Sequence, residues 1–178
     1  MKKYYIFDLD GTLADSMGYW YGNFQLEGLQ GEQRMDEIRR IMYRNYAELI
    51  QPKPGAVQLL ERLKASGAVM CIASATEKAV SAPFMEKFGL NSFFEFYLDC
   101  AQVGARKDKP DIYLEAARRL GADISDCVVV EDAAYCAETA RNAGFSVVGI
   151  YDPNTAPRGD VSEFSDWFIT KLADFPEL

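Results

Sequence analysis

The stretch YYIFDLDGTL, residues 4–13, ends a run of apolar residues on two aspartates that lie one residue apart. Residues 4–7 lack polar alternation, which is typical of a short strand buried on both faces of a parallel sheet. A Gly-Thr pair follows the aspartates, as expected for a turn. Because neighbouring carboxylates repel each other, Asp8 and Asp10 indicate a functional site rather than an ordinary strand end.

Further short apolar runs alternate with segments of helical periodicity along the chain. We expect the other strands at residues 68–73, 96–98, 127–130, 146–150 and 167–169. We expect helices, each followed by a glycine that would end it, at residues 56–66, 79–88, 111–120 and 133–143. Pro83 would shorten or kink the second of these helices. This alternation predicts a Rossmann-like α/β fold, in which a parallel sheet lies between two helical layers.

A long segment separates the first strand from the helix that begins at residue 56. It has about forty residues, far more than an ordinary strand-to-helix loop. Residues 34–50 carry apolar side chains at helical spacing, and residues 18–29 predict a second helix. We therefore expect a core domain of residues 1–15 and 54–178 and a small α-helical cap of residues 16–53. The aromatic residues expected either to face the cleft or to pack within the protein are Tyr19, Trp20, Tyr21 and Phe24.

The composition excludes several classes of function. The 178 residues include 19 basic and 27 acidic side chains, giving a net charge of −8, which argues against nucleic-acid or anionic-membrane partners. Histidine is absent, which excludes histidine-based catalytic triads and zinc sites. No apolar run is long enough for a signal peptide or membrane span, so we expect a cytoplasmic protein, by default a monomer. Without a C-x-x-C pair, we expect reduced thiols at Cys71, Cys100, Cys127 and Cys136.

Polar side chains stand at the carboxyl ends of several expected strands. Ser74 follows the second strand, and Glu131 and Asp132 follow the fourth. Open α/β sheets bind ligands at this edge, so these residues should share a cleft with Asp8 and Asp10. Clustered carboxylates without histidine or thiolate are suited to Mg²⁺. One carboxylate as nucleophile and a second for proton transfer would suit phosphoryl transfer.

Taken singly, each of these features has an ordinary structural explanation. Asp10-Gly11 is a common turn pair, and Ser74 is a common helix cap. An acidic pair at a helix start also occurs for capping, and lysine-rich loops are usually solvated. Their joint occurrence at successive strand ends is what favours a functional site.

Four motifs in this order resemble those of the haloacid dehalogenase-like superfamily of phosphohydrolases. They are DLDGTLADS (8–16), IASAT (72–76), KDKPD (107–111) and VVVEDA (128–133), and VVGIYD (147–152) is also similar. The resemblance implies a Rossmann-like core with a helical cap inserted after the first strand. It also implies Mg²⁺ as cofactor and an aspartyl-phosphate intermediate.

The resemblance further implies roles for individual residues. Asp8 would be the nucleophile, Asp10 the general acid and base, and Ser74 a ligand of the phosphoryl oxygens. The catalytic lysine would be Lys107 or Lys109, and counting back from Pro110-Asp111 favours Lys107. The metal ligands would be Asp8, the backbone carbonyl of Asp10, Glu131 and Asp132. The remaining phosphate-binding residues would be Gly11, Thr12, Ala75 and Lys109.

The function implied is hydrolysis of a small phosphorylated metabolite, such as a sugar phosphate or a phosphoglycolate-like acid. Asp10 favours a phosphatase, since the dehalogenases of this superfamily lack the second acid. A sugar-phosphate mutase of the same superfamily is an alternative, although such mutases generally use a cap histidine. Alternatives of another class are a phospho-receiver domain with Asp99 as acceptor and a non-catalytic phosphate-binding protein.

Overall fold

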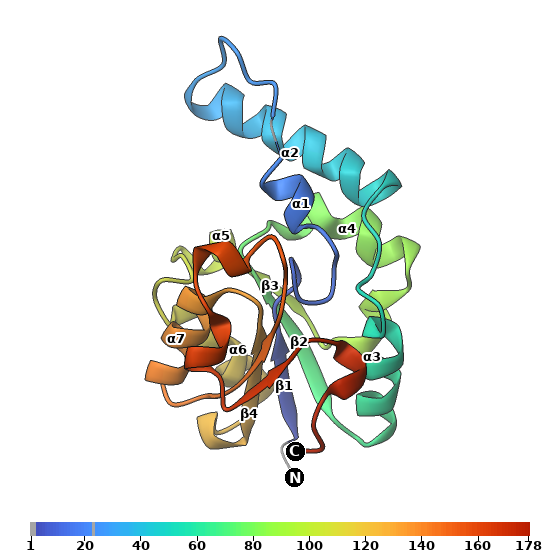
Figure 1. The fold of residues 1–178 in the computed structure, drawn as a ribbon, viewed down its shortest axis with the longest axis vertical. Coiled ribbons are helices and arrows are strands. Elements are labelled where there is room, and N and C mark those ends of the chain that lie inside the picture. The colour runs from blue at the N-terminus through green and yellow to red at the C-terminus, as the bar shows by residue number, and fades with distance from the viewer. Residues whose placement is uncertain (1–2, 23) are drawn as a thin grey trace.

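A parallel β-sheet forms the centre of the protein in the computed structural model, which describes residues 3–22 and 24–178 (Figure 1). In this part of the chain the sheet has six strands in the order β3-β2-β1-β4-β5-β6, all neighbours being parallel. The strands are β1 (Tyr4–Phe7), β2 (Val69–Ser74), β3 (Tyr97–Asp99), β4 (Cys127–Glu131), β5 (Ser146–Ile150) and β6 (Trp167–Ile169). The predicted Rossmann-like α/β fold is confirmed.

Helices cover both faces of this sheet. The helices of the described residues are α1 (Met17–Trp20), α2 (Gly31–Glu48), α3 (Ala56–Ala65), α4 (Lys78–Lys87), α5 (Cys100–Val103), α6 (Asp111–Leu120) and α7 (Ala134–Asn142). Of these, α3 and α4 pack on one face of the sheet, and α6 and α7 pack on the other. Short 3₁₀ turns occur at Leu90–Phe93, Ile124–Asp126, Ala156–Arg158, Val161–Phe164 and Leu172–Asp174. No helix among the described residues is both long and apolar enough to cross a membrane.

Successive side chains of β1 enter two different hydrophobic cores, which explains the absence of polar alternation. Tyr5 and Phe7 pack in the layer that contains α3 and α4. Ile6, between them, packs in the layer that contains α6 and α7. The apolar runs of β2 and β4 are divided in the same way, so burial on both faces fixes the strands to the centre of the sheet.

The structure contradicts two local expectations. Of the helix predicted at residues 18–29, the described part contains only the end of α1, which stops at Trp20, and Gly28 adopts the left-handed conformation with φ of 78°. Glycine favours such turns over helix, which outweighs the aromatic pattern. Pro83 lies within α4 but does not shorten it, since the helix continues to Lys87. The alternative expectation, a kink at Pro83, stays a prediction.

The long helix of the insertion, α2, extends beyond the carboxyl ends of the strands (Figure 1). We call residues 16–53 the insertion. The C-terminal half of α2 packs against α4, with Met42 and Tyr46 fully buried. Nearer its N-terminus, Arg39 pairs with Glu77 at 2.8 Å, just before α4. The insertion is therefore anchored along one side of the sheet edge.

Candidate active site

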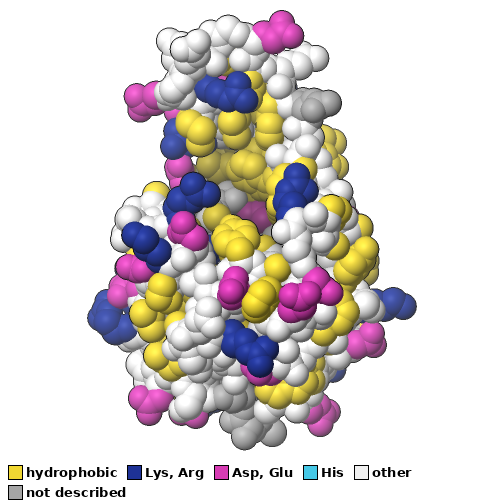
Figure 2. All heavy atoms as spheres, turned by 60° about the vertical axis from the view of Figure 1, so that its left-hand side comes forward, with side chains coloured by type: hydrophobic (Ala, Val, Ile, Leu, Met, Phe, Trp, Pro, Cys, Tyr) yellow, Lys and Arg dark blue, Asp and Glu magenta, His cyan; other side chains and the backbone are white. Residues whose placement is uncertain are grey.

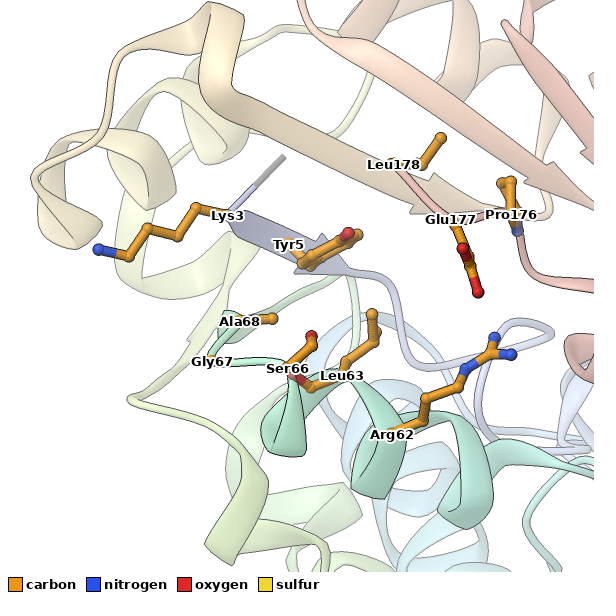
Figure 3. Close-up of a pocket in the computed structure, with 10 residues that line it drawn as sticks. All are labelled: Lys3, Tyr5, Arg62, Leu63, Ser66, Gly67, Ala68, Pro176, Glu177 and Leu178. Atoms are coloured by element: carbon orange, nitrogen blue, oxygen red, sulfur yellow. Dashed lines mark hydrogen bonds between the residues drawn. The ribbon is translucent and has the colours of Figure 1, made fainter. Parts of the chain in front are cut away.

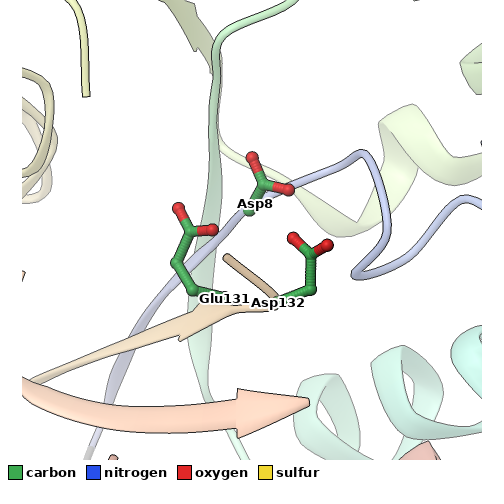
Figure 4. A group of neighbouring side chains, drawn as sticks. All are labelled: Asp8, Glu131 and Asp132. Atoms are coloured by element: carbon green, nitrogen blue, oxygen red, sulfur yellow. The ribbon is translucent and has the colours of Figure 1, made fainter. Parts of the chain in front are cut away.

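Three carboxylates meet at the carboxyl ends of β1 and β4. The N–H of Asp8 donates to the carbonyl of Val130 at 2.9 Å, which continues the pairing of these strands by one residue. Asp8 is thereby placed beside Glu131 and Asp132, and one oxygen from each carboxylate lies within 4.8 Å of the others (Figure 4). All three are buried. The structure thus brings together three of the predicted metal ligands.

A buried lysine lies against two of these acids. The Nζ atom of Lys107 is 2.5 Å from Asp8 Oδ1 and 2.6 Å from Glu131 Oε1. The hydroxyl of Tyr113 donates to the same Glu131 oxygen at 2.6 Å. Lys109 is exposed, and its backbone N–H donates to the carbonyl of Arg106. Of the two lysines considered from the sequence, the structure therefore places Lys107 in contact with Asp8.

Burial and crowding shape the protonation of this cluster. Burial raises the pKa of Asp8 well above its ordinary value, Glu131 raises it further, and Lys107 opposes the rise. Burial alone would lower the pKa of Lys107, but the carboxylates of Asp8 and Glu131 raise it well above its usual range. Burial and then Glu131 raise the pKa of Asp132 to about 7. A cation bound here would reverse the rise for the carboxylates.

The residue after Asp10 must be a glycine because the loop passes very close to Asp132. Gly11 has a φ of 80°, and a Cβ atom added there would lie 2.1 Å from Asp132 Oδ2. Its N–H donates to the carbonyl of Ala14 at 2.9 Å, so that N–H is used within the loop. Phosphate binding by backbone N–H groups near Gly11 stays a prediction. Gly11 lets the loop approach the acidic cluster.

The second aspartate of the motif, Asp10, has hydrogen-bond partners different from those of Asp8. The carboxylate of Asp10 receives four hydrogen bonds, three of them on Oδ1: from Ser16 Oγ at 2.6 Å, from Trp20 Nε1 at 3.2 Å and from the hydroxyl of Tyr46. On Oδ2 it accepts from Thr76 Oγ1 at 2.6 Å. Three of the four donors belong to the insertion. The carboxylate of Asp10 is thus oriented by the segment that the sequence predicted to be a cap.

The other phosphate-binding residues predicted from the sequence differ in their exposure. Ser74 is fully buried, and its hydroxyl oxygen accepts the N–H of Thr76 at 3.0 Å. Thr12 is also fully buried, with no hydrogen-bond partner for Oγ1 among the described residues. Ala75 is exposed and lines a cleft next to Asp10. Ser74 therefore shapes the turn that aims Thr76 at Asp10.

Asp132 has a polar support that the sequence analysis did not include. Thr155 Oγ1 donates to Asp132 Oδ2 at 2.6 Å. Thr155 is itself held by its N–H, which donates to Asp152 Oδ1 at 3.1 Å. Asp152 is buried and pairs with Lys53 at 2.8 Å. The only signal in the sequence was the similarity of VVGIYD, which ends at Asp152, to the family.

Asp99 does not have the surroundings of a phosphoryl acceptor. It is buried, and its carboxylate accepts the backbone N–H groups of Gln102 and Lys78, both at 2.9 Å. These bonds cap α5 and the start of α4. Asp99 is a structural capping residue, which removes the basis for the phospho-receiver alternative.

A cleft opens between α2 and the sheet edge (Figure 2). Its volume is about 500 Å³, and Asp10 is among the residues that line it. Of the four aromatic residues in question, Trp20 and Tyr21 line this cleft. Tyr19 and Phe24 pack against the hydrophobic core, as does part of Trp20. The other lining residues are Met17, Met35, Ile38, Arg39, Ala75, Thr76, Glu77, Val80 and Arg106.

A second cavity, of about 470 Å³, lies beside the start of β1 and the C-terminal residues (Figure 3). Its walls include Tyr5, Arg62 and Leu63, and none of the predicted site residues lines it. The two cavities have similar volumes, so size does not distinguish them. Unlike the second cavity, the cleft below α2 reaches Asp10 of the DLDGT motif, and we identify it as the candidate active-site cleft. A further cavity of about 470 Å³ has Asp132 of the acidic cluster in its wall, together with Tyr151 and Asp152.

Comparisons with known proteins agree with this geometry. The haloacid dehalogenase-like hydrolase family matches residues 19–144. A haloacid dehalogenase-like hydrolase domain-containing protein of Arabidopsis thaliana, At4g39970, is 31% identical over an alignment of 136 residues, and the match covers 72% of this chain but only 43% of that protein. Hexitol phosphatase A of Escherichia coli is 28% identical, with 88% of this chain and 86% of that protein covered.

The solved structures include a similar fold over nearly the whole chain. The crystal structure of CbbY from Rhodobacter sphaeroides in complex with phosphate has a TM-score of 0.81 at 19% identity, covering 98% of this chain and 96% of that one. The family match covers most of the chain and includes the motifs at residues 72–76, 107–111 and 128–133. The prediction from the motifs is confirmed: the chain belongs to the haloacid dehalogenase-like hydrolase family.

Proposed function

We propose that this protein is a Mg²⁺-dependent phosphatase that hydrolyses a small phosphate monoester through an aspartyl-phosphate on Asp8. The observation that carries the proposal is the contrast between two neighbouring carboxylates. Asp8 is buried between Lys107 and an acidic cluster, whereas Asp10 lines an open cleft. The phosphatase name of the Escherichia coli relative supports the same reaction class.

The donor set fits Mg²⁺. Asp8, Glu131 and Asp132 offer only carboxylate oxygens, which are the hard ligands that Mg²⁺ prefers. Three carboxylates against the single positive charge of Lys107 leave two negative charges when all are ionised, which one divalent cation neutralises. When bound by these residues and the carbonyl of Asp10, Mg²⁺ would supply charge neutralisation for the carboxylates and the phosphate.

The chain's own residues then divide the reaction into two steps. In the first, a carboxylate oxygen of Asp8 forms a bond to phosphorus, the ester P–O bond breaks, and Asp10 gives its proton to the departing alcohol oxygen. In the second, Asp10 takes a proton from water, the water oxygen bonds to phosphorus, and the bond from Asp8 to phosphorus breaks. Lys107 holds the Asp8 carboxylate in place for both steps.

The insertion would act as the cap that covers the leaving group. Ser16, Trp20 and Tyr46 reach from it to Asp10, so its placement and the orientation of the proton donor are connected. Hydrolysis is favoured over transfer to a second sugar hydroxyl, because the chain has no histidine to serve as the mutase cap residue that the resemblance implied.

The test uses purified protein, Mg²⁺ and nitrophenyl phosphate. We expect phosphate release that Asp8→Asn reduces by about 10⁴-fold or more, since the nucleophile is lost. Acid quenching of the wild-type reaction should trap a protein heavier by one phosphoryl group, located on the peptide that contains Asp8. Turnover by Asp8→Asn at a rate near that of the wild type would overturn the proposal.

A further inference from the structure

The cleft next to Asp10 is lined mainly by apolar side chains. Met35 and Ile38 line it from α2, Val80 lines it from α4, and Trp20, which donates to Asp10, lines it as well. Figure 2 shows hydrophobic side chains inside this hollow. Met35 is 47% exposed and Tyr21 is 42% exposed, although both are large hydrophobic residues. Covering such side chains with an apolar group removes apolar area from water and is favourable.

Four of the polar side chains that line the cleft, those of Asp10, Thr76, Arg39 and Glu77, already have partners within the protein. Asp10 accepts four hydrogen bonds, one of which uses the hydroxyl of Thr76. Arg39 and Glu77 are paired with each other at 2.8 Å. A bound polyol would need new hydrogen-bond partners for each hydroxyl that it buries, and an unpartnered hydroxyl is costly. Arg106, which is exposed, is the remaining charged side chain that lines the cleft.

We propose that this cleft binds the leaving group of the substrate and that this leaving group is largely apolar, an alkyl or aryl alcohol rather than a sugar or polyol. The inference rests on the proposed phosphatase function and concerns the substrate class of the same site. The support for this inference is that the apolar side chains line the same cavity as Asp10, the residue assigned to protonate the leaving group. It departs from the sugar phosphates expected from the sequence.

The central experiment compares hexyl phosphate with mannitol phosphate. Both are esters of a six-carbon primary alcohol, so they differ mainly in the hydroxyl groups of the chain. We expect kcat/KM to favour hexyl phosphate by at least tenfold, and to rise about fourfold for each methylene added from ethyl to hexyl phosphate. Equal or better turnover of mannitol phosphate, or no dependence on chain length, would overturn the inference.

Variants of the cleft wall test whether the preference arises there. Met35→Gln should reduce kcat/KM for hexyl phosphate severalfold and that for methyl phosphate much less, because methyl phosphate has less apolar surface for the cleft wall to cover. Met35 is largely exposed, so this change should not affect folding. Tyr43→Gln is the matched control, since Tyr43 is also exposed on α2 but does not line the cleft. An equal loss in both variants would contradict the assignment.

Failure of the inference and failure of the proposed function give different results. If nitrophenyl phosphate is hydrolysed in an Asp8-dependent way but polyol esters are preferred, only the apolar leaving group is wrong. If neither nitrophenyl phosphate nor any other ester releases phosphate in the presence of Mg²⁺, the proposed phosphatase function is wrong. The inference about the substrate class is then wrong as well.

Discussion

Asp8 and Asp10 are separated by a single residue, yet different parts of the molecule hold them. Asp8 contacts Lys107, which precedes α6, and lies beside the two acids at the carboxyl end of β4, so the core provides its surroundings. Asp10 is held by Ser16, Trp20 and Tyr46 of the insertion and by one core residue.

The difference suggests a division of labour within the motif. The end that would receive phosphate consists of buried charges fixed by the sheet, because charge neutralisation needs a preorganised site. The end that would face the leaving group consists of hydroxyl and indole donors and an open cleft. Changes in the insertion should therefore alter the choice of ester, whereas changes in the core should remove activity with every ester.

Among changes that keep both aspartates of the motif, the largest effect is expected at Lys107. Lys107→Met should lower kcat about 10²- to 10³-fold with every phosphate ester, because the positive charge beside Asp8 is lost. Lys109→Met should remain within about twofold of the wild type, since Lys109 is exposed. Phosphate-release assays on both variants make the comparison, with circular dichroism to verify folding. A greater loss in Lys109→Met would reverse the assignment.

A smaller effect is expected at the support of Asp132. Thr155→Val removes the hydroxyl that donates to Asp132 Oδ2 and keeps the shape of the side chain. We expect Mg²⁺ affinity to fall about 10- to 100-fold, as is typical when a partner of a metal ligand is lost. Titration calorimetry measures this directly. Thr139→Val, at an exposed hydroxyl on α7, is the control and should bind Mg²⁺ as the wild type does.

The leaving-group end should respond in a substrate-dependent way. Tyr46→Phe removes one hydrogen bond to Asp10 and should reduce kcat/KM for hexyl phosphate about tenfold. Nitrophenyl phosphate should be affected less, because nitrophenolate leaves without needing a proton. Equal losses with both esters would indicate a structural role only. Tyr43→Phe, on the exposed face of the same helix, should change neither.

The sequence predicted the surroundings of Asp8, which the core provides, better than those of Asp10, which the insertion mostly provides. The buried runs of β1 and β4 are adjacent parallel strands, so acids at their carboxyl ends must lie near one another. Asp8, Glu131 and Asp132 follow from that rule alone. The choice between Lys107 and Lys109 depended on the path of a short loop. The structure shows this path, whereas the local sequence pattern does not determine it.

The insertion was less predictable because its contacts are tertiary. Helical periodicity predicted α2, but in that pattern Tyr46 was only one of several apolar residues, and no role was predicted for its hydroxyl. Its hydroxyl reaches Asp10 because of how α2 is rotated and packed against α4, which periodicity does not determine. Thr76 and Thr155 were missed for a similar reason, since each becomes a donor only through the turn that carries it.

The smallest effect expected is a pH dependence of the stabilisation by Mg²⁺. Burial and Glu131 raise the pKa of Asp132 from 3.8 to about 7 in the folded state. A raised pKa means that the folded protein keeps this proton longer than the unfolded chain does. The contribution to stability is thus present below pH 3.8 and is lost as pH rises through about 7 in the absence of metal.

Mg²⁺ should replace that proton, so the stabilisation of the folded state by Mg²⁺ should increase as Asp132 loses its proton. We expect the increase in Tm caused by Mg²⁺ to be larger at about pH 8 than at about pH 6, on the two sides of the Asp132 pKa. Thermal denaturation with and without MgCl₂ measures it. Asp132→Asn should flatten the dependence, whereas Asp174→Asn, at an exposed acid near the C-terminus, should preserve it. An equal increase at both pH values would show that Asp132 does not exchange its proton for metal, and would leave Asp8 and Glu131 as the carboxylates that bind it.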